Sequence, residues 1–279
     1  VLVSVKATTF DWTERIIAKQ ATGLRQMVES LQQLKATFDD QGFVVVPGLL
    51  PQALREQLLG IAAEHLAMKL APVEYEVDVH YPGSPSDDTS EGAETARRLL
   101  QTYSRHSAFR DWGTADQIKA ILGELFGHGD VLLSQCHHNC VMTKQPGFSS
   151  VTRWHQDIRY WHFDRQDLIS VWSALGNESK KNGCLRVLPG SHRWTLDPGQ
   201  FDAARFLRSD LDSNKALLKT AQAVPLNPGD VLFFHARLFH AASRNTSSET
   251  KYSLVYTYHE ASNAPIESTR SAQFPSIPF

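Results

Sequence analysis

The sequence lacks any strong bias of charge. Its 279 residues carry 28 lysines and arginines against 30 aspartates and glutamates, a formal net charge of -2 at pH 7. Domains that bind nucleic acid usually show a clear excess of basic residues, so this balance disfavours nucleic acid as a partner. Hydrophobic residues make up 42% and aromatic residues 10% of the chain, which excludes global disorder.

Long apolar runs and cysteines are also scarce. No segment approaches the roughly 18 consecutive apolar residues of a membrane-spanning helix, so we expect no membrane partner. The first residues, VLVSVKATTFDW, lack the basic stretch, apolar run and cleavage site of a secretory signal. The three cysteines cannot all pair with one another. Together these features favour a reducing compartment, the cytoplasm.

The N-terminal part of the chain has the pattern of helices. Apolar residues recur at steps of three and four, and a proline at position 51 suits a first helical turn. A short buried strand is expected over 43–47, and the Pro-, Gly- and Ser-rich residues 72–92 predict a loop that is equally a lid or a plain insertion. The expected helices span about 17–34, 51–68, 94–106 and 115–126.

From residue 130 the pattern becomes that of short strands separated by Gly, Pro, Asn and Asp. Such a series is typical of a β-sandwich or barrel. We find no internal repeat. The sequence therefore predicts a mainly β fold with flanking helices in one domain over 1–279, with a helical part at about 1–128 and a barrel core at about 129–260.

Trp154-His155-Gln156-Asp157 is the sharpest local motif. In an extended strand, His155 and Asp157 would point to the same face, so a nitrogen and a carboxylate oxygen can approach one ion. The later run PGDVLFFHARLFH offers His235 or His240 as a third ligand. Two histidines and a carboxylate form the facial triad of non-haem Fe(II) oxygenases, which leaves half of the coordination sphere open.

Charge and motif considerations separate iron from its main competitor. Asp157 would neutralise one charge of Fe(II), and the carboxylate of a chelating 2-oxo acid would neutralise the other, so a buried centre would carry no net charge. Zinc also accepts two histidines and a carboxylate, but zinc hydrolases often carry HExxH on a helix, and this chain has no such string. Downstream, Lys251 and Ser253 share one strand face and can hold a distal carboxylate.

At this point the motifs HQDIRYW, VWSAL, NGCLRVLPGSH, NPGDVLFFHARLFHAAS and KYS, in this order, resemble the phytanoyl-CoA dioxygenase family of Fe(II)/2-oxoglutarate-dependent oxygenases. DDQGFVVVPGLL is similar to that family's opening helix–strand pattern. The resemblance covers about residues 30–260 and is densest over 154–258. It implies a double-stranded β-helix, a jelly-roll or cupin-like barrel, with the N-terminal helices packed on it.

The resemblance also implies roles for particular residues. His155, Asp157 and His240 fall on the iron ligands, with His240 rather than His235 as the distal one. Trp172 falls beside the 2-oxoglutarate, and Lys251 falls where the family usually has an arginine for the distal carboxylate. Lysine offers a point charge instead of a bidentate fork, so weaker 2-oxoglutarate binding, a different oxo acid and help from Ser253 all stay open. A carboxylate at position 157, where related halogenases have a small residue, indicates a hydroxylase-type enzyme.

Several other side chains have a functional and a structural interpretation. Strand alternation would place Cys136, His138 and Cys140 on one face and His137 on the other; a separate zinc site there is disfavoured, whereas His138 is expected to line the 2-oxoglutarate pocket or to be a hydrogen-bonded core histidine. Lys144 is expected to be solvated, with a cosubstrate contact as the alternative. Arg153 and Arg159 are expected in structural salt bridges, although either can reach the barrel mouth. Tyr160, Trp161 and His162 can line a substrate mouth or cap the barrel, and Arg244 is expected in a loop, with substitution for the missing distal arginine as the alternative.

The sequence thus predicts an Fe(II)- and 2-oxoglutarate-dependent dioxygenase that uses O2 to oxidise an unactivated C–H bond of a small organic substrate and releases succinate and CO2. Two alternatives stay open: a metal-dependent cupin-like isomerase or hydrolase, and a non-catalytic small-molecule binder. Neither the substrate nor the oligomeric state is predicted by the sequence.

Overall fold

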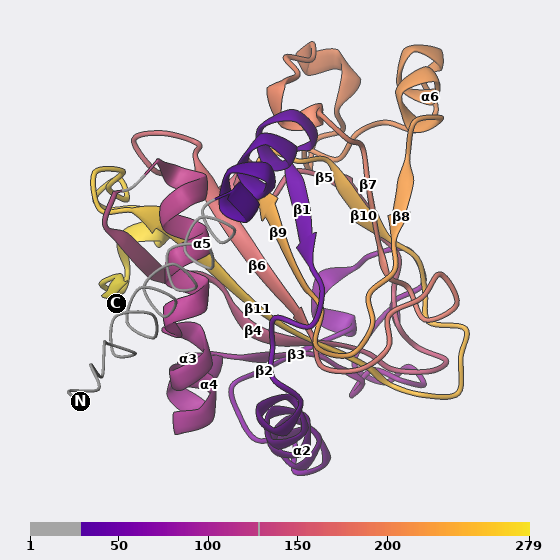
Figure 1. Cartoon of the computed structure of the whole chain (residues 1–279). Helices are drawn as coiled ribbons and strands as arrows, with labels where there is room; N and C mark the ends of the chain where they lie inside the picture. Colours follow the sequence, from indigo (N-terminus) through magenta and orange to yellow (C-terminus); the bar gives the residue numbers. More distant parts are fainter. Residues whose placement is uncertain (1–28, 128) are drawn as a thin grey trace, which may run out of the picture.

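In the computed structural model, residues 29–127 and 129–279 are described, and they build two antiparallel sheets that enclose a common interior (Figure 1). The larger sheet has the strand order β1-β9-β6-β11-β4-β3-β2, with β12 paired to β4, and the smaller sheet has the order β5-β10-β7-β8. The strands of the larger sheet are β1 Phe43–Val46, β2 Val73–Tyr75, β3 Ala96–Leu100, β4 Val131–Lys144, β6 Leu168–Ala174, β9 Val231–His235, β11 Lys251–Glu260 and β12 Ile277–Pro278. Those of the smaller sheet are β5 Thr152–His155, β7 Leu185–Val187, β8 Gln222–Val224 and β10 His240–Ala242.

Helices lie mainly along the outside of the larger sheet (Figure 1). Residues 29–41 are also helical. The α-helices are α2 Gln52–Ala67, α3 Thr102–Arg105, α4 Ser107–Gly113, α5 Asp116–Phe126 and α6 Asp212–Leu218, and the 3-10 turns are η1 Val77–Val79, η2 Asp157–Tyr160, η3 Ser191–Arg193, η4 Pro198–Gln200 and η5 Arg270–Ala272. None of the helices in the described ranges combines the length and the apolar character that a membrane crossing requires.

The period-two alternation of β6 and β11 divides the core into two layers. Val171, Leu254 and Tyr256 face outward and pack with apolar residues of α4 and α5. Trp172 and Val255 face inward and pack against side chains of the smaller sheet. Because successive strand residues point to opposite faces, inward positions on these strands are the ones that can line a cavity between the sheets.

The mainly β architecture with flanking helices is confirmed. The helices predicted over 51–68 and 115–126 and the strand over 43–47 are confirmed by α2, α5 and β1. The helix predicted over 94–106 is wrong at its start, because residues 96–100 form β3, which pairs with β4. β2 likewise lies inside the expected loop 72–92. Residues 17–28 of the first predicted helix lie outside the described residues.

Candidate active site

The site begins with a pair of histidines on neighbouring strands. His155 ends β5, His240 begins β10, and the two residues are direct partners in the antiparallel register. Their ring centroids are 4.2 Å apart, and both side chains are buried. Register pairing therefore brings together two imidazoles that are 85 positions apart in the sequence, as predicted for His240.

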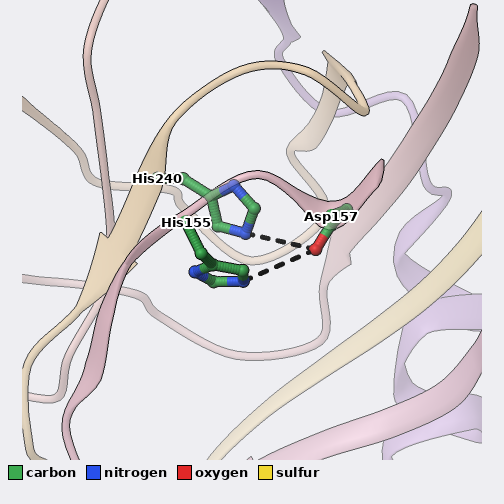
Figure 2. A group of neighbouring side chains, drawn as sticks. All are labelled: His155, Asp157 and His240. Atoms are coloured by element: carbon green, nitrogen blue, oxygen red, sulfur yellow. Dashed lines mark ion pairs between the residues drawn. The ribbon is translucent and has the colours of Figure 1, made fainter. Parts of the chain in front are cut away.

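Asp157 completes the cluster from a different kind of backbone. Its Oδ1 lies 3.6 Å from Nε2 of His155 and 3.5 Å from Nε2 of His240 (Figure 2). The expectation that residues 155 and 157 share one extended strand is wrong, because β5 ends at His155 and Asp157 opens the 3-10 turn η2. A hydrogen bond from the Ile158 amide to the Ala236 carbonyl fixes that turn, and the carboxylate still reaches the histidines.

The protonation state of both histidines suits a metal. Nδ1 of His155 donates to the Arg153 carbonyl oxygen at 2.8 Å, and Nδ1 of His240 donates to the Leu238 carbonyl oxygen at 3.0 Å. These bonds leave both Nε2 atoms, which face Asp157, free to donate lone pairs. Burial and the neighbouring His240 lower the pKa of His155 to about 3, and burial also lowers the pKa of His240. Neutral imidazoles are the form that binds metals.

The donor set fits a divalent transition metal. Ligand atoms of His155, Asp157 and His240 all lie within 4.8 Å of one another and form the one His, Cys, Asp or Glu cluster of this kind among the described residues. Two imidazole nitrogens and one carboxylate oxygen suit Fe(II) with open coordination positions. The competing ligand His235 lies elsewhere, where its Nε2 is 3.5 Å from Oδ1 of Asp167.

His138 lies beside the metal cluster and also lines the interior cavity described below. Nε2 of His138 is 3.1 Å from Oδ1 of Asp157. Burial alone would lower the pKa of His138, but the Asp157 carboxylate raises it to about 9. The predicted alternation of residues 136–140 is wrong, because the ladder of β4 with β11 is interrupted by a bulge between Ser134 and Asn139. As a result both His137 and His138 contact the Trp161 ring.

A cavity between the sheets adjoins the open side of the histidine pair. Its wall contains His138, His155, His240, Trp172 and Lys251, which all lie on strands of the two sheets. It also contains Arg97, Arg98 and Lys144, so the cavity is rich in cations. The expectation that Lys144 is solvated is wrong. Its side chain is buried, its Nζ donates to the Ser150 carbonyl oxygen at 2.8 Å, and burial lowers its pKa to about 7.

Lys251 and Ser253 share a face, as predicted, but they have a partner that the sequence did not reveal. Oε2 of the fully buried Glu178 is 3.1 Å from Nζ of Lys251. Its Oε1 accepts hydrogen bonds from Ser253 Oγ at 2.7 Å and from Trp172 Nε1 at 2.9 Å. Glu178 lies in the polar segment GNESKKNG, which is typical of an exposed turn. In the folded chain it forms an antiparallel bridge with Leu226, and its side chain is buried.

A second cavity, of about 270 Å³, also adjoins the cluster. It shares His138 and His155 with the first cavity and contains Asp157. Tyr160 and Trp161 line it, as their position after the HQD motif suggested. His162 is not among its lining residues. Of the two arginines that flank the ligands, Arg153 forms the predicted salt bridge, to Asp202 at 2.6 Å. The salt bridge predicted for Arg159 is wrong, because its guanidinium binds the Tyr81 hydroxyl and the Ala204 carbonyl and pairs with no carboxylate among the described residues. Arg244 binds loop carbonyls.

Comparisons with known proteins agree with this geometry. Residues 38–253 match the sequence model of the phytanoyl-CoA dioxygenase family. The human peroxisomal phytanoyl-CoA dioxygenase is 26% identical over 229 residues, which cover 78% of this chain and 64% of that protein. The zebrafish (Danio rerio) phytanoyl-CoA dioxygenase domain-containing protein 1 is 29% identical over 150 residues, which cover 48% of this chain and 50% of that protein.

Solved structures establish the fold. The epimerase SnoN, in a complex with Fe3+, alpha ketoglutarate and nogalamycin RO, has a TM-score of 0.68 at 22% identity, covering 85% of this chain and 86% of SnoN. EctD from S. alaskensis with 2-oxoglutarate and 5-hydroxyectoine has a TM-score of 0.68 at 20% identity, covering 84% of this chain and 77% of EctD. The predicted jelly-roll fold is confirmed. With a family match over most of its length, this chain belongs to the phytanoyl-CoA dioxygenase family.

Proposed function

We propose that this protein is an Fe(II)- and 2-oxoglutarate-dependent dioxygenase that hydroxylates or otherwise oxidises an unactivated C–H bond of a small organic substrate. The co-products are succinate and CO2. The observation that carries the proposal is the buried cluster of His155, Asp157 and His240, placed between a cation-rich interior cavity and an open outer one. One cavity suits a dianionic cosubstrate, and the other suits a substrate.

The interior cavity is assigned to 2-oxoglutarate. We place the distal carboxylate near Lys251 and Ser253, with Trp172 and His138 in the same wall. Glu178 already neutralises Lys251, so a second carboxylate needs a further cation. Lys144, whose ammonium has no carboxylate partner among the described residues, supplies it. The family's single arginine is thereby replaced by two lysines and one buried glutamate.

The protein's own contribution is positioning and exclusion of water. Two neutral imidazoles and the Asp157 carboxylate would hold the iron, which when bound supplies the activation of O2 that drives oxidation of the substrate. The backbone acceptors of His155 and His240 fix the orientation of both rings. Side chains such as Phe234 and Leu185 close the interior cavity with apolar surface, which keeps water away from the reacting groups.

The test is succinate formation from 2-oxoglutarate by the protein reconstituted with Fe(II), together with calorimetric binding of 2-oxoglutarate to the Mn(II) protein without oxygen. We expect both in the native protein and expect succinate formation to disappear in His155→Ala. Absence of 2-oxoglutarate binding in the presence of Mn(II) would refute the proposal. Activity that survives Lys251→Ala with unchanged cosubstrate affinity would favour a cupin-like isomerase or hydrolase instead.

We also assign the protein to the cytoplasm. All three cysteines are free and buried, which is the state expected in a reducing compartment. Detection of the intact protein in the cytosolic fraction of its host, and its absence from other fractions, is the corresponding test.

A further inference from the structure

The outer cavity, which under the proposed function holds the substrate, has an unusual balance of charge. Arg98, Arg159 and Arg270 line it. Arg98 is paired with Glu74 at 3.4 Å, and the Asp157 carboxylate belongs to the metal cluster. Arg159 and Arg270 make no ion pair with a carboxylate among residues 29–127 and 129–279. The wall therefore keeps positive charge that the protein does not neutralise.

The side chain of Arg159 is held by hydrogen bonds and ring contacts. It lies in η2, two residues after Asp157. Its guanidinium donates to the hydroxyl oxygen of Tyr81 at 3.1 Å and to the Ala204 carbonyl oxygen at 3.4 Å. The guanidinium carbon is 4.0 Å from the ring centre of Phe206 and 4.8 Å from that of Tyr160. Stacking and hydrogen bonding thus hold the group in place, and no carboxylate in the described part of the chain pairs with it.

Phe206 connects this arginine to the metal cluster. The ring is buried, and its centroid is 5.8 Å from that of His155, in an edge-on arrangement. Arg153 also lies 4.0 Å from the Phe206 ring centre, so two guanidinium groups contact the same ring. Arg153 is neutralised by Asp202 at 2.6 Å. Of the two arginines that contact Phe206, Arg153 therefore has a carboxylate partner and Arg159 has none among the described residues.

Tyr81 adds a hydrogen-bond donor beside Arg159. Its phenolic oxygen accepts the bond from Arg159, which leaves the phenolic hydrogen free to donate to a ligand. Its ring packs edge-on to Phe206, at 5.5 Å between centroids. A guanidinium and a phenol side by side, partly withdrawn from solvent, match the two oxygens of an oxyanion. Tyr81 comes from the segment 72–92, for which the sequence predicts either a lid or a plain insertion.

We propose that the outer cavity binds a small anionic substrate through Arg159 and Tyr81, with the C–H bond to be oxidised directed at the metal cluster. The recognised group is an oxyanion, a carboxylate or a phosphorus oxyanion. The cavity volume of about 270 Å³ is near the lower limit of small-molecule sites, roughly 300 Å³, so the part of the substrate inside it is compact. This inference rests on the proposed function for the role of the bound molecule, but not for the binding itself.

The experiment uses weak probe anions whose proton relaxation reports distance from a paramagnetic ion. Propionate, methylphosphonate and the neutral propionamide are each added to full-length protein loaded with Mn(II), with and without saturating 2-oxoglutarate. The native protein should speed the relaxation of propionate or methylphosphonate protons but not of propionamide protons. The comparison of the two anions decides between a carboxylate and a phosphorus oxyanion.

Variants identify the residue responsible. Arg159→Gln should weaken anion binding about tenfold or more, because a charge-assisted hydrogen bond is lost. Arg159→Lys should restore part of it. Arg153→Gln, which removes the paired arginine of the same stack, should leave it unchanged. Equal relaxation in native protein and Arg159→Gln, or equal binding of propionamide and propionate, overturns the inference. Failure of 2-oxoglutarate to bind in the same samples overturns the proposed function instead. In that case the samples without 2-oxoglutarate still show whether anion binding depends on Arg159.

Discussion

Lys144 and Lys251 lie directly opposite one another on β4 and β11, yet among residues 29–127 and 129–279 only Lys251 has a carboxylate partner. Like charges opposite each other in a sheet destabilise it, and both side chains are buried. Burial, Arg97 and Lys251 together lower the pKa of Lys144 to about 7. Lys144 therefore gives the cavity one ammonium group that can form an ion pair with a carboxylate of the ligand.

The first prediction concerns the pH dependence of 2-oxoglutarate binding. Lys144 is charged below its pKa of about 7 and neutral above it, so affinity should be greatest at low pH within the stable range and fall as pH rises. If only the charged form binds, the dissociation constant should rise up to about tenfold per pH unit above 7, until the higher pKa of the complex is reached. Anaerobic calorimetry with Mn(II) between pH 6 and 9 measures this.

Lys144→Met should bind 2-oxoglutarate weakly at every pH and lose this slope. Lys219→Met, at an exposed position, is the matched control and should keep it. The other charged groups facing Lys144 are Arg97, Glu76, Arg244 and Lys251. A slope that persists in Lys144→Met would assign the titration to one of them and contradict the prediction.

The second prediction concerns Glu178→Gln. Removing one partner of a buried ion pair costs about 3–5 kcal/mol of unfolding free energy, because Lys251 is left unpaired. A carboxylate of 2-oxoglutarate can then replace the missing partner, so the variant should be less stable alone and yet bind 2-oxoglutarate more tightly. The thermal shift caused by 2-oxoglutarate should be larger in the variant than in the native protein. A smaller shift would show that Glu178 helps to bind the cosubstrate rather than competing with it.

The third prediction separates the two histidines that the sequence left as alternatives. His240→Ala should reduce Fe(II) affinity by more than about 100-fold, since even partners of ligands contribute 10- to 100-fold. His235→Asn should leave it unchanged, because His235 contacts Asp167 and accepts a hydrogen bond from the Arg237 amide. Metal content after anaerobic reconstitution and gel filtration distinguishes them. Loss of iron in both variants would count against this ligand set.

The fourth prediction concerns the attachment of α4 to the larger sheet. Nε1 of the fully buried Trp112 donates to Ser173 Oγ at 2.9 Å. Ser173→Ala leaves this donor buried without a partner and should lower the unfolding free energy by about 1–3 kcal/mol. Urea denaturation measures the change. Thr114→Ala, at the exposed end of the same helix, should change stability less, and metal binding should be unaltered in both.

The sequence predicted which residues form the metal cluster more reliably than it predicted the secondary structure that carries them. The positions of His155, Asp157 and His240 followed from motif order, but the strand assumed under residues 155–157 is a strand end followed by a 3-10 turn. Periodicity also gave a helix where β3 forms. A short apolar run has the same pattern in a buried strand and in a helix, and only pairing with β4 decides between them.

Local sequence could not reveal which charges are paired. Lys144 precedes a Pro-Gly turn and Glu178 lies in a polar segment, so both have the local signature of exposed residues. Their burial depends on strands that meet from distant parts of the chain. The difference in ion pairing between Arg153 and Arg159 has the same origin. Phe206 contacts both arginines, but Asp202 of the same segment pairs with Arg153 and not with Arg159.

The sequence by itself determined the kind of chemistry, since two imidazoles, a carboxylate and a lysine–serine face are properties of residue type and order. Tertiary structure alone decided how those groups are charged and what surrounds them: which lysine is neutralised, which arginine is left without a counter-ion, and where a bulge redirects His138. The physical reason is that solvation and Coulomb interaction depend on distances through space, which strand register sets and which separation along the chain does not.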